Sequence, residues 1–403
     1  MMRRMPENGL RRGDRDYRRA SLAMLAVGLA VFNTLYATQA MLPILVSDLD
    51  VSPTTAALTV SAATGALAVC VVPASILSER FGRGPILLTS ALAAAVVGLL
   101  LPLAPDATTL ILLRALQGAL VAGTPAVAMT WLSEEIDPLD LGRAMGLYIA
   151  GNTVGGLTGR LIPAGLLEFT HWRWALLVSA LVALSFAIIT AVLLPRQKRF
   201  TPQPIHPRHV LRSMISHWRD WRLAGIFLIA FIGMGVFVSV YNFIGFRMID
   251  HFGLSPGLVG AVFIMYLSGT WSSARAGALS DRLGRGTVLI GGAALMWVGL
   301  IMMASPWLWL TLLGLFVFTA AFFAMHSTAS SWIGVIATKG RAEASSMYLF
   351  CYYAGSSLLG GAAGWAFSAL PWFGFIGVVA LVLVFVIIVA AALARRDARP
   401  TAA

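Results

Sequence analysis

Long apolar runs separated by short polar segments follow one another along the whole chain. A helix needs roughly 20 mostly apolar residues to cross a bilayer, and twelve runs of suitable length are found. The pattern therefore predicts an all-α integral membrane protein with twelve transmembrane helices. Their expected bounds are 21–46, 54–77, 85–103, 108–132, 143–168, 172–194, 221–247, 255–279, 285–304, 306–330, 342–367 and 371–394.

A polar stretch at 195–220 divides these runs into two groups of six. Its prolines and charges indicate a linker, and 208–219 has the pattern of a basic amphipathic helix on a membrane surface. We expect a basic arm at 1–20 and a tail at 395–403 on either side of the helical regions.

The two groups of runs repeat each other. LSERFGR at 77–83 matches LSDRLGR at 279–285, and AGNTVGGLTGR from Ala150 matches AGSSLLGGAAGW from Ala354. Matches in the same order at a nearly constant offset indicate an internal repeat. Secondary transporters use such parallel repeats and hold their solute between the two copies. The repeat therefore predicts two six-helix bundles, at 21–194 and 221–394.

Composition supports a lipid environment, because hydrophobic residues make up 59% of the 403 residues and charged residues only 11%. Soluble domains contain about 25% charged residues. The net charge is +12, and seven of the 29 Lys and Arg residues lie in the arm and seven at 195–222. Cations concentrate in cytoplasmic loops, so we expect both termini and the linker in the cytoplasm. This placement argues against nucleic-acid binding as the cause of the basic charge.

The sequence offers little for enzymatic chemistry. It contains no Gly-rich phosphate loop, no carboxylate pair or nucleophile motif within a span, and no metal-ligand spacing. We therefore expect no enzyme activity, no metal and no cofactor. The cations are almost all Arg and Ala is abundant, which favours a GC-rich bacterium and its inner membrane.

Several polar residues fall within the apolar runs, where burial of a polar group is costly and a function is the default hypothesis. Arg114 has Gln117 one helical turn away and no acid in the interior of any span; alternatively, it reaches the outer interface. Arg160 follows a glycine-rich helix face that permits close packing. The candidates for a solute cavity are Asn33, Tyr36, Gln39, Tyr241, Asn242, His326 and Arg160.

His326 is the only histidine inside a span. Its imidazole has an unperturbed pKa near physiological pH, and it begins the small polar run HSTASS. It could line the cavity or carry a proton, or it could be held neutral by a hydrogen bond. The polar residues of the first and seventh spans could equally join helices to each other.

Together these motifs resemble the major facilitator superfamily, in its drug:proton antiporter branch and its arabinose-efflux-like subgroup. The loop signature is complete from Gly277 to Arg285, and LRALQG at 113–118 resembles the antiporter motif of the fourth helix. The fifth-helix signature is partial, without a proline after Gly155. The first loop departs from the pattern, with Ser75 in place of Gly and Gly84 in place of a basic residue.

The resemblance implies roles for several residues. Arg114 and Gln117 would belong to the proton-coupling machinery, and Gly155 and Gly159 would form a bendable seal. The charged residues of the two repeated loops would latch the two halves together and release them as access alternates. These residues are Glu79, Arg80, Asp281 and Arg282.

The expected function is proton-linked export of a small organic solute by alternating access, driven by the proton gradient. The solute is expected to be neutral or anionic, because basic and neutral residues but no acids occur in the span interiors. Uptake by the same fold is an alternative, and a membrane sensor without transport is a more remote one. The protein is expected to work as a monomer.

Overall fold

The computed structural model describes residues 9–202 and 207–397. Among these residues the only strand-like pairing is an isolated bridge between Leu10 and Ile136, and the rest of the regular structure is helical. The first eight helices form the N half, and they are α1 (Arg15–Leu35), α2 (Leu42–Leu49), α3 (Pro53–Phe81), α4 (Arg83–Leu100), α5 (Ala107–Val121), α6 (Gly123–Glu135), α7 (Pro138–Leu167) and α8 (Trp172–Leu193).

The second group of helices forms the C half. They are α10 (Trp221–Asp250), α11 (Pro256–Ala261), α12 (Tyr266–Leu283), α13 (Arg285–Met302), α14 (Leu308–Ile336), α15 (Arg341–Ala369) and α16 (Trp372–Asp397). The linker between the halves contains α9 (Pro207–Ser216), and short 3-10 helices η1 to η4 cover Gln39–Met41, Leu101–Leu103, His217–Arg219 and Val262–Met265.

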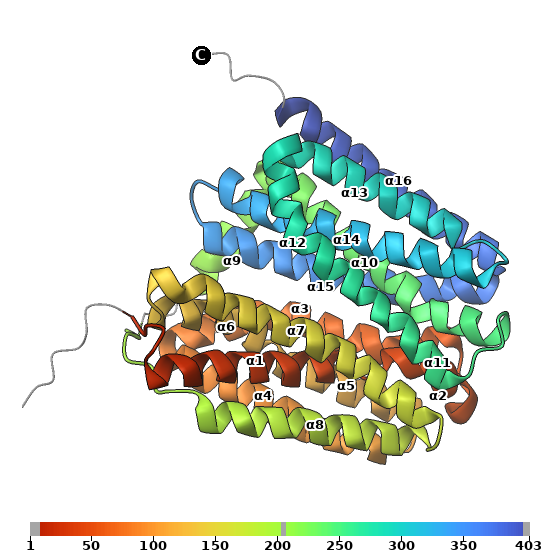
Figure 1. Ribbon diagram of the computed structural model, residues 1–403, viewed down its shortest axis with the longest axis horizontal. Helices are drawn as coiled ribbons and strands as arrows, with labels where there is room; N and C mark the ends of the chain where they lie inside the picture. Colours follow the sequence, from red (N-terminus) through yellow and green to blue (C-terminus); the bar gives the residue numbers. More distant parts are fainter. Residues whose placement is uncertain (1–8, 203–206, 398–403) are drawn as a thin grey trace, which may run out of the picture.

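The two halves lie side by side with their long helices roughly parallel (Figure 1). Within the N half α1 packs on α7 and α8, and within the C half α10 packs on α15 and α13 packs on α14 and α16. The halves meet mainly through α3 with α15 and through α7 with α11. We call the end where α1 begins and α9 lies the linker end, and the end with α2 and α11 the distal end.

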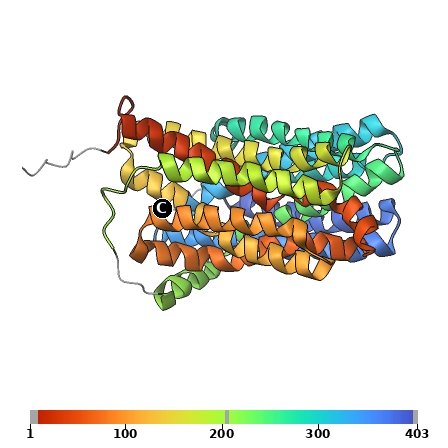
Figure 2. The ribbon, with the colours of Figure 1, turned by 90° about the horizontal axis from the view of Figure 1, so that it is seen from below.

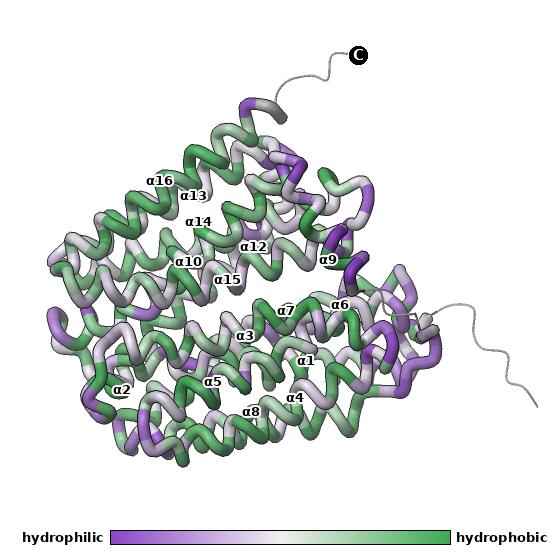
Figure 3. Tube along the Cα trace, turned by 180° about the vertical axis from the view of Figure 1, so that it is seen from behind, coloured by the Kyte–Doolittle hydropathy of each residue, from purple (hydrophilic) through white to green (hydrophobic). Residues whose placement is uncertain are grey.

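Ten helical stretches of the described chain are long and apolar enough to cross a membrane. The expected spans at 143–168 and 342–367 are not among the ten, but they correspond to α7 and α15, which have 30 and 29 residues. At 1.5 Å per residue both helices are long enough to cross. Glycine, serine and charged residues lower their hydropathy. Figure 3 shows hydrophobic residues along the middle of the helices and hydrophilic ones toward their ends.

Matching turns join the repeated loop sequences to the helices that follow them. Gly82 ends α3 with φ of 97°, and Gly284 ends α12 with φ of 83°. L-amino acids with a Cβ rarely adopt such positive φ values, whereas glycine adopts them readily. The repeated Gly-Arg pair therefore specifies the same reversal of direction in each half.

The linker helix α9 lies at the linker end, obliquely to the long helices (Figure 2). Gln197 Oε1 accepts a hydrogen bond from Gly84 N at 2.7 Å, and Glu135 Oε1 accepts bonds from the backbone N of Lys198 and Arg199. The expected amphipathic helix at 208–219 is present as α9 and the following η3. Residues 1–8 of the expected arm and 398–403 of the tail lie outside the described residues.

Candidate functional site

A break in the first span organises the candidate site. The helix α1 ends at Leu35, and the chain continues through η1 into α2. Pro43 lies at the start of α2, where its ring is incompatible with a helical carbonyl at Gln39 four residues earlier. The last carbonyls of α1 lie at this break. Thr34 O keeps one long backbone bond, from Ala37 N at 3.5 Å, and the carbonyls of Thr34 and Leu35 also accept hydrogen bonds from a side chain.

Arg114 uses these carbonyls. Its side chain is fully buried. Nη1 donates to Thr34 O at 2.9 Å, Nη2 donates to Leu35 O, and Nε donates to Thr59 O of α3 at 2.9 Å. A fourth bond runs from Nη1 to Gln117 Oε1 at 2.5 Å. The guanidinium is thus satisfied by neutral oxygens within the N half.

Gln117 and Gly118 hold this arrangement in place. Gln117 Nε2 donates to Ala94 O of α4 at 3.0 Å, so the amide connects Arg114 to a third helix. Gly118 lies against the backbone of Ala63, where a Cβ would collide with the carbonyl group. Because α5 can approach α3 this closely, Arg114 reaches the Thr59 carbonyl.

Arg160 occupies a different place, at the contact between the halves. It is 2% exposed, and its Nε donates to Gln39 Oε1 at 2.7 Å and its Nη1 to Gly156 O at 2.6 Å, both within the N half. Its Nη2 donates to the Tyr266 hydroxyl of the C half at 3.0 Å. No salt bridge of the described residues includes Arg160.

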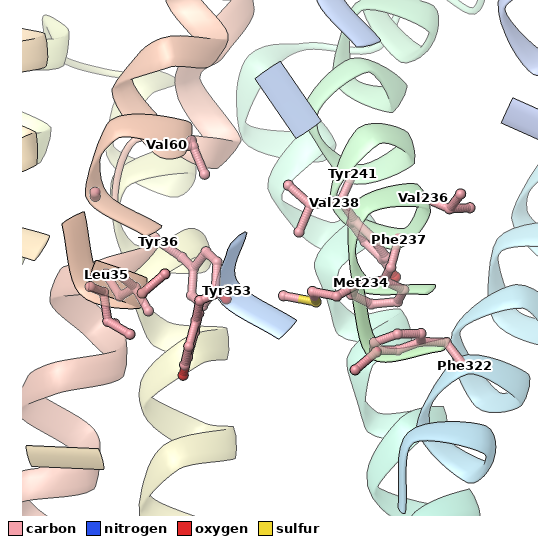
Figure 4. Packing of buried hydrophobic residues seen from close by; sticks show 14 of the residues in the cluster. Leu35, Tyr36, Val60, Met234, Val236, Phe237, Val238, Tyr241, Phe322 and Tyr353 are labelled. Atoms are coloured by element: carbon pink, nitrogen blue, oxygen red, sulfur yellow. The ribbon is translucent and has the colours of Figure 1, made fainter. Parts of the chain in front are cut away.

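Aromatic rings surround this guanidinium. Its Cζ atom lies 4.1 Å from the centre of the Tyr36 ring, 4.4 Å from that of Tyr266 and 5.3 Å from that of Phe263. Figure 4 shows Tyr36 beside Tyr353 on one side of the view, and Phe237 and Tyr241 of α10 on the other. The cage stabilises the cation through the ring quadrupoles, but it supplies no negative charge.

Two amides join the halves beside Arg160. Gln39 Nε2 donates to Asn242 Oδ1 at 2.8 Å, and Asn242 Nδ2 donates to Gly360 O of α15 at 3.5 Å. Arg160, Gln39, Asn242 and Tyr266 thus form one hydrogen-bonded chain, which we call the distal network. Four of the expected cavity residues take part in the distal network or its aromatic cage, and they are Tyr36, Gln39, Asn242 and Arg160.

The remaining cavity candidates lie apart from this chain. Tyr241 is adjacent to the cage, but its hydroxyl pairs with Thr319 Oγ1 at 2.6 Å. His326 belongs to α14 and faces α15, where its Nδ1 pairs with the Tyr348 hydroxyl at 2.8 Å and its ring lies 4.7 Å from that of Tyr352.

Asn33 is buried within the N half and does not join the distal network. Its Nδ2 donates to Ser179 O of α8 at 3.0 Å and to the Ser179 hydroxyl at 3.1 Å, while its Oδ1 accepts from Thr158. These bonds connect α1 to α8 and α7. They correspond to the alternative in which an isolated polar residue joins helices to each other.

The glycines of the fifth span pack directly on α1. A Cβ on Gly155 would lie 2.7 Å from Leu29 O and 2.8 Å from Gly28 O, and one on Gly159 would meet the Asn33 backbone. This close approach of α7 to α1 places Arg160 beside Gln39.

The loop residues at the linker end contact the protein unequally. Arg83, rather than Arg80, makes the ion pair of the first loop, with Glu134 Oε1 at 3.2 Å. Arg80 is exposed and lies near Phe81, while Glu79 is half-buried. Asp281 and Arg282 of the second loop are exposed, and neither has a hydrogen-bond or ionic partner among the described residues.

Tyr266 and Phe263 were not among the residues expected at the site. They lie next to the junction of η4 and α12, which the sequence presents as one continuous apolar run. An aromatic pair one turn apart was the available signal, but such pairs are common in apolar spans.

The hydrogen bonds between the halves indicate which end is closed. In the described part of the chain they join Gln39 to Asn242, Arg160 to Tyr266, Ser61 to Ser357, Thr54 to Ser368, and Glu168 to Gly257. All of these residues lie in the distal halves of their helices or in distal loops. The molecule is therefore closed at the distal end.

Comparison with known proteins identifies the family. The family model described as Major Facilitator Superfamily matches residues 22–275. The Escherichia coli (strain K12) inner membrane transport protein YnfM is 38% identical over 392 residues, which cover 97% of this chain and 94% of YnfM. The chain belongs to the Major Facilitator Superfamily. The Bacillus subtilis (strain 168) MFS-type transporter YybF is 36% identical and covers 97% of both chains.

Solved structures of other transporters share the fold. A bacterial homolog of the human lysosomal transporter Spinster, in an inward-facing and unoccupied conformation, has a TM-score of 0.74 at 15% identity and covers 96% of this chain and 99% of its own. The nucleoside transporter NupG has a TM-score of 0.71 at 16% identity, covering 95% and 98%. The expected all-α, twelve-helix superfamily fold is confirmed, and the chain is a multi-pass membrane transporter whose named relatives are not enzymes.

Proposed function

We propose that this Major Facilitator Superfamily transporter exports a small organic solute, neutral or anionic, in exchange for protons. It would work as a monomer in a bacterial inner membrane, with both termini and the linker in the cytoplasm, and would belong to the drug:proton antiporter branch. The observation that carries the proposal is Arg160, a buried cation at the junction of the halves with no carboxylate partner in the described chain.

The electrostatics of Arg160 favour an anionic group on the solute. The guanidinium is hydrogen-bonded only to neutral oxygens, so no counter-charge offsets it in this low-dielectric setting. A solute carboxylate or sulfonate would form a charge-assisted and potentially bidentate pair with it. Tyr36, Phe263 and Tyr266 would provide apolar ring surface for the remainder of the solute.

Binding at Arg160 would also act on the distal network. The guanidinium bonds to Gln39 and Tyr266 would compete with bonds to the solute, and Gln39 in turn holds Asn242 of the other half. A solute that enters from the linker end and takes these donors would weaken the closure of the distal end. Such differential binding to two conformations is what alternating access requires.

The direction of transport is inferred from charge and from partial relatives. The linker end carries most of the cationic residues, which supports its cytoplasmic placement. The Streptomyces alboniger puromycin resistance protein pur8 is 35% identical over 39% of this chain and 31% of its own length. Its name supports export. Arg114 and Gln117 are our candidates for proton coupling, since no acid lies in the span interiors.

Transport in inside-out vesicles with an imposed pH gradient tests this function. A panel of anionic, neutral and cationic solutes would first find a transported compound. Arg160→Gln should then lower its transport by at least about tenfold, because a charge-assisted bond contributes about 1.5–3 kcal/mol. Arg160→Lys should retain part of the activity, since it keeps the charge but loses the planar fork.

Arg275→Gln is the matched control. Arg275 also lies in a span, but it is exposed and its Nη1 bonds only to Trp271 O, at 3.4 Å. Its loss should leave transport unchanged at equal amounts of protein in the membrane. Wild-type transport of an anion by Arg160→Gln would contradict the proposal, as would a preference for cations across the panel.

A further inference from the structure

A cleft of about 640 Å³ lies at the linker end of the C half, away from the distal network. The start of α10, the end of α14 and the end of α16 surround it. Trp332, Ile336 and Leu393 line it and are 5%, 8% and 2% exposed. These side chains give the cleft an apolar floor.

The rim of the cleft is cationic. Asp220 and Arg222 are committed to each other, with Arg222 Nη2 3.1 Å from Asp220 Oδ2, and Asp220 also caps α10 through Arg222 N at 2.9 Å. Arg219 is exposed and has no acidic partner in the part of the chain that the structure describes. The rim therefore carries one positive charge in excess, beside the exposed hydroxyl of Thr338.

The adjacent helix α9 places this rim at the level of a membrane surface. Leu211, Ile215 and Trp218 are 54%, 56% and 40% exposed and share one face at helical spacing. Arg208 and Arg212 lie next to that face and are also exposed. An apolar stripe flanked by basic residues is typical of helices that lie in the headgroup region of a bilayer.

The neighbouring face of α9 and the start of η3 fix this segment to the C half. Met214 is 2% exposed, and His217 Nε2 pairs with Gly340 O at 3.0 Å, just before α15 begins. The apolar and basic face of α9 is thus held in a set orientation next to the cleft. Trp221, 40% exposed at the start of α10, continues the same interfacial level, as is common for tryptophan at membrane boundaries.

We propose that this cleft binds an anionic phospholipid of the cytoplasmic leaflet. Arg219 would pair with the phosphate, the Thr338 hydroxyl would donate to it, and an acyl chain would lie along Trp332 and Leu393. A zwitterionic lipid carries a compensating cation in its headgroup and would bind more weakly. A free phosphate would meet the same arginine but would leave the apolar floor uncovered.

Native mass spectrometry of the full chain tests the site, using micelles that contain equal amounts of phosphatidylglycerol and phosphatidylcholine. The wild-type protein should retain phosphatidylglycerol in preference to phosphatidylcholine. Arg219→Gln should lower phosphatidylglycerol retention about fivefold, which corresponds to one basic residue near an anionic surface. Thr338→Glu should lower it similarly through repulsion, and it leaves Arg219 intact.

Arg143→Gln is the matched control, because Arg143 is another exposed arginine at the linker end but lies on α7 of the N half. It should retain phosphatidylglycerol as the wild type does. Equal retention of both lipids would overturn the proposal, and so would equal losses in Arg143→Gln and Arg219→Gln. Complete displacement of the lipid by millimolar inorganic phosphate would also overturn it, since a soluble anion would then suffice.

Discussion

Two buried arginines of the same half have different surroundings, and the difference defines what each can do. Arg114 donates to carbonyls of α1 and α3 and to Gln117, all within the N half. Arg160 shares its donors between the halves. The spacing of Arg114 and Gln117 predicted their contact. The α1 carbonyl partners of Arg114 were not predictable, because these carbonyls accept a side chain only at the place where α1 ends.

Arg114→Lys should lower transport by at least about tenfold, although the charge is kept. An ammonium offers three donors from one point, whereas the guanidinium reaches carbonyls on two helices and an amide at once. Each lost charge-assisted bond costs about 1.5–3 kcal/mol. The measurement is pH-driven transport of the compound found in the solute panel, at matched protein levels. Arg275→Lys serves as the control, and equal activity of the two variants would refute the role of the planar fork.

At the level of elements, the first span shows the limit of the sequence pattern. The run at 21–46 is mostly apolar, with scattered polar residues such as Asn33 and Gln39, and only Pro43 signals an interruption of the helix. The break falls earlier, at Leu35, where the carbonyls of Thr34 and Leu35 bond to Arg114 of a distant segment. A tertiary contact of this kind is invisible to periodicity. By contrast, the repeated Gly-Arg loops and the glycine face of α7 follow from local chemistry, and the structure contains both.

The glycine face of α7 gives a prediction with an internal control. Gly155→Ala should lower the free energy of unfolding by about 1–3 kcal/mol through overpacking, because its Cβ would lie 2.7 Å from Leu29 O. The expected readout is a drop of a few degrees in Tm in detergent. On the same helix, a Cβ on Gly165 would meet no atom within 4 Å, so Gly165→Ala should have little effect. Equal Tm values for both variants would mean that α1 can move away from α7 without a loss of stability.

Across the whole molecule, α3 and α15 pack antiparallel in a regular register. Ser357 bonds to Ser61 O at 2.7 Å, and Thr54 pairs with Ser368. Both pairs lie toward the distal end of the two helices. Extending the register of the Thr54 and Ser368 pair by about five turns on each helix toward the linker end brings Val72 opposite Phe350. When the halves rock, the distance between Ser61 and Ser357 at the distal level should therefore increase as the distance between Val72 and Phe350 decreases, and the reverse.

Disulfide cross-linking in a background without Cys70 and Cys351 measures this motion. One protein carries Ser61→Cys with Ser357→Cys, and a second carries Val72→Cys with Phe350→Cys. Adding Gln39→Ala removes a bond that closes the distal end and should reduce the first cross-link while increasing the second. Yields that rise or fall together would contradict rigid-body rocking of the halves.

The linker is attached to the protein at both of its ends, and this limits how far the two halves can separate. Glu135 binds the backbone N of Lys198 and Arg199, and α9, which begins at Pro207, is fixed to the C half through Met214 and the following His217. The tether between the halves is then only the chain from Arg199 to Pro207. Eight residue steps reach about 28 Å when fully extended. While both attachments hold, this length of chain limits how far the halves can separate at the linker end. If the solute enters there, as we propose, the same length limits the size of the solute.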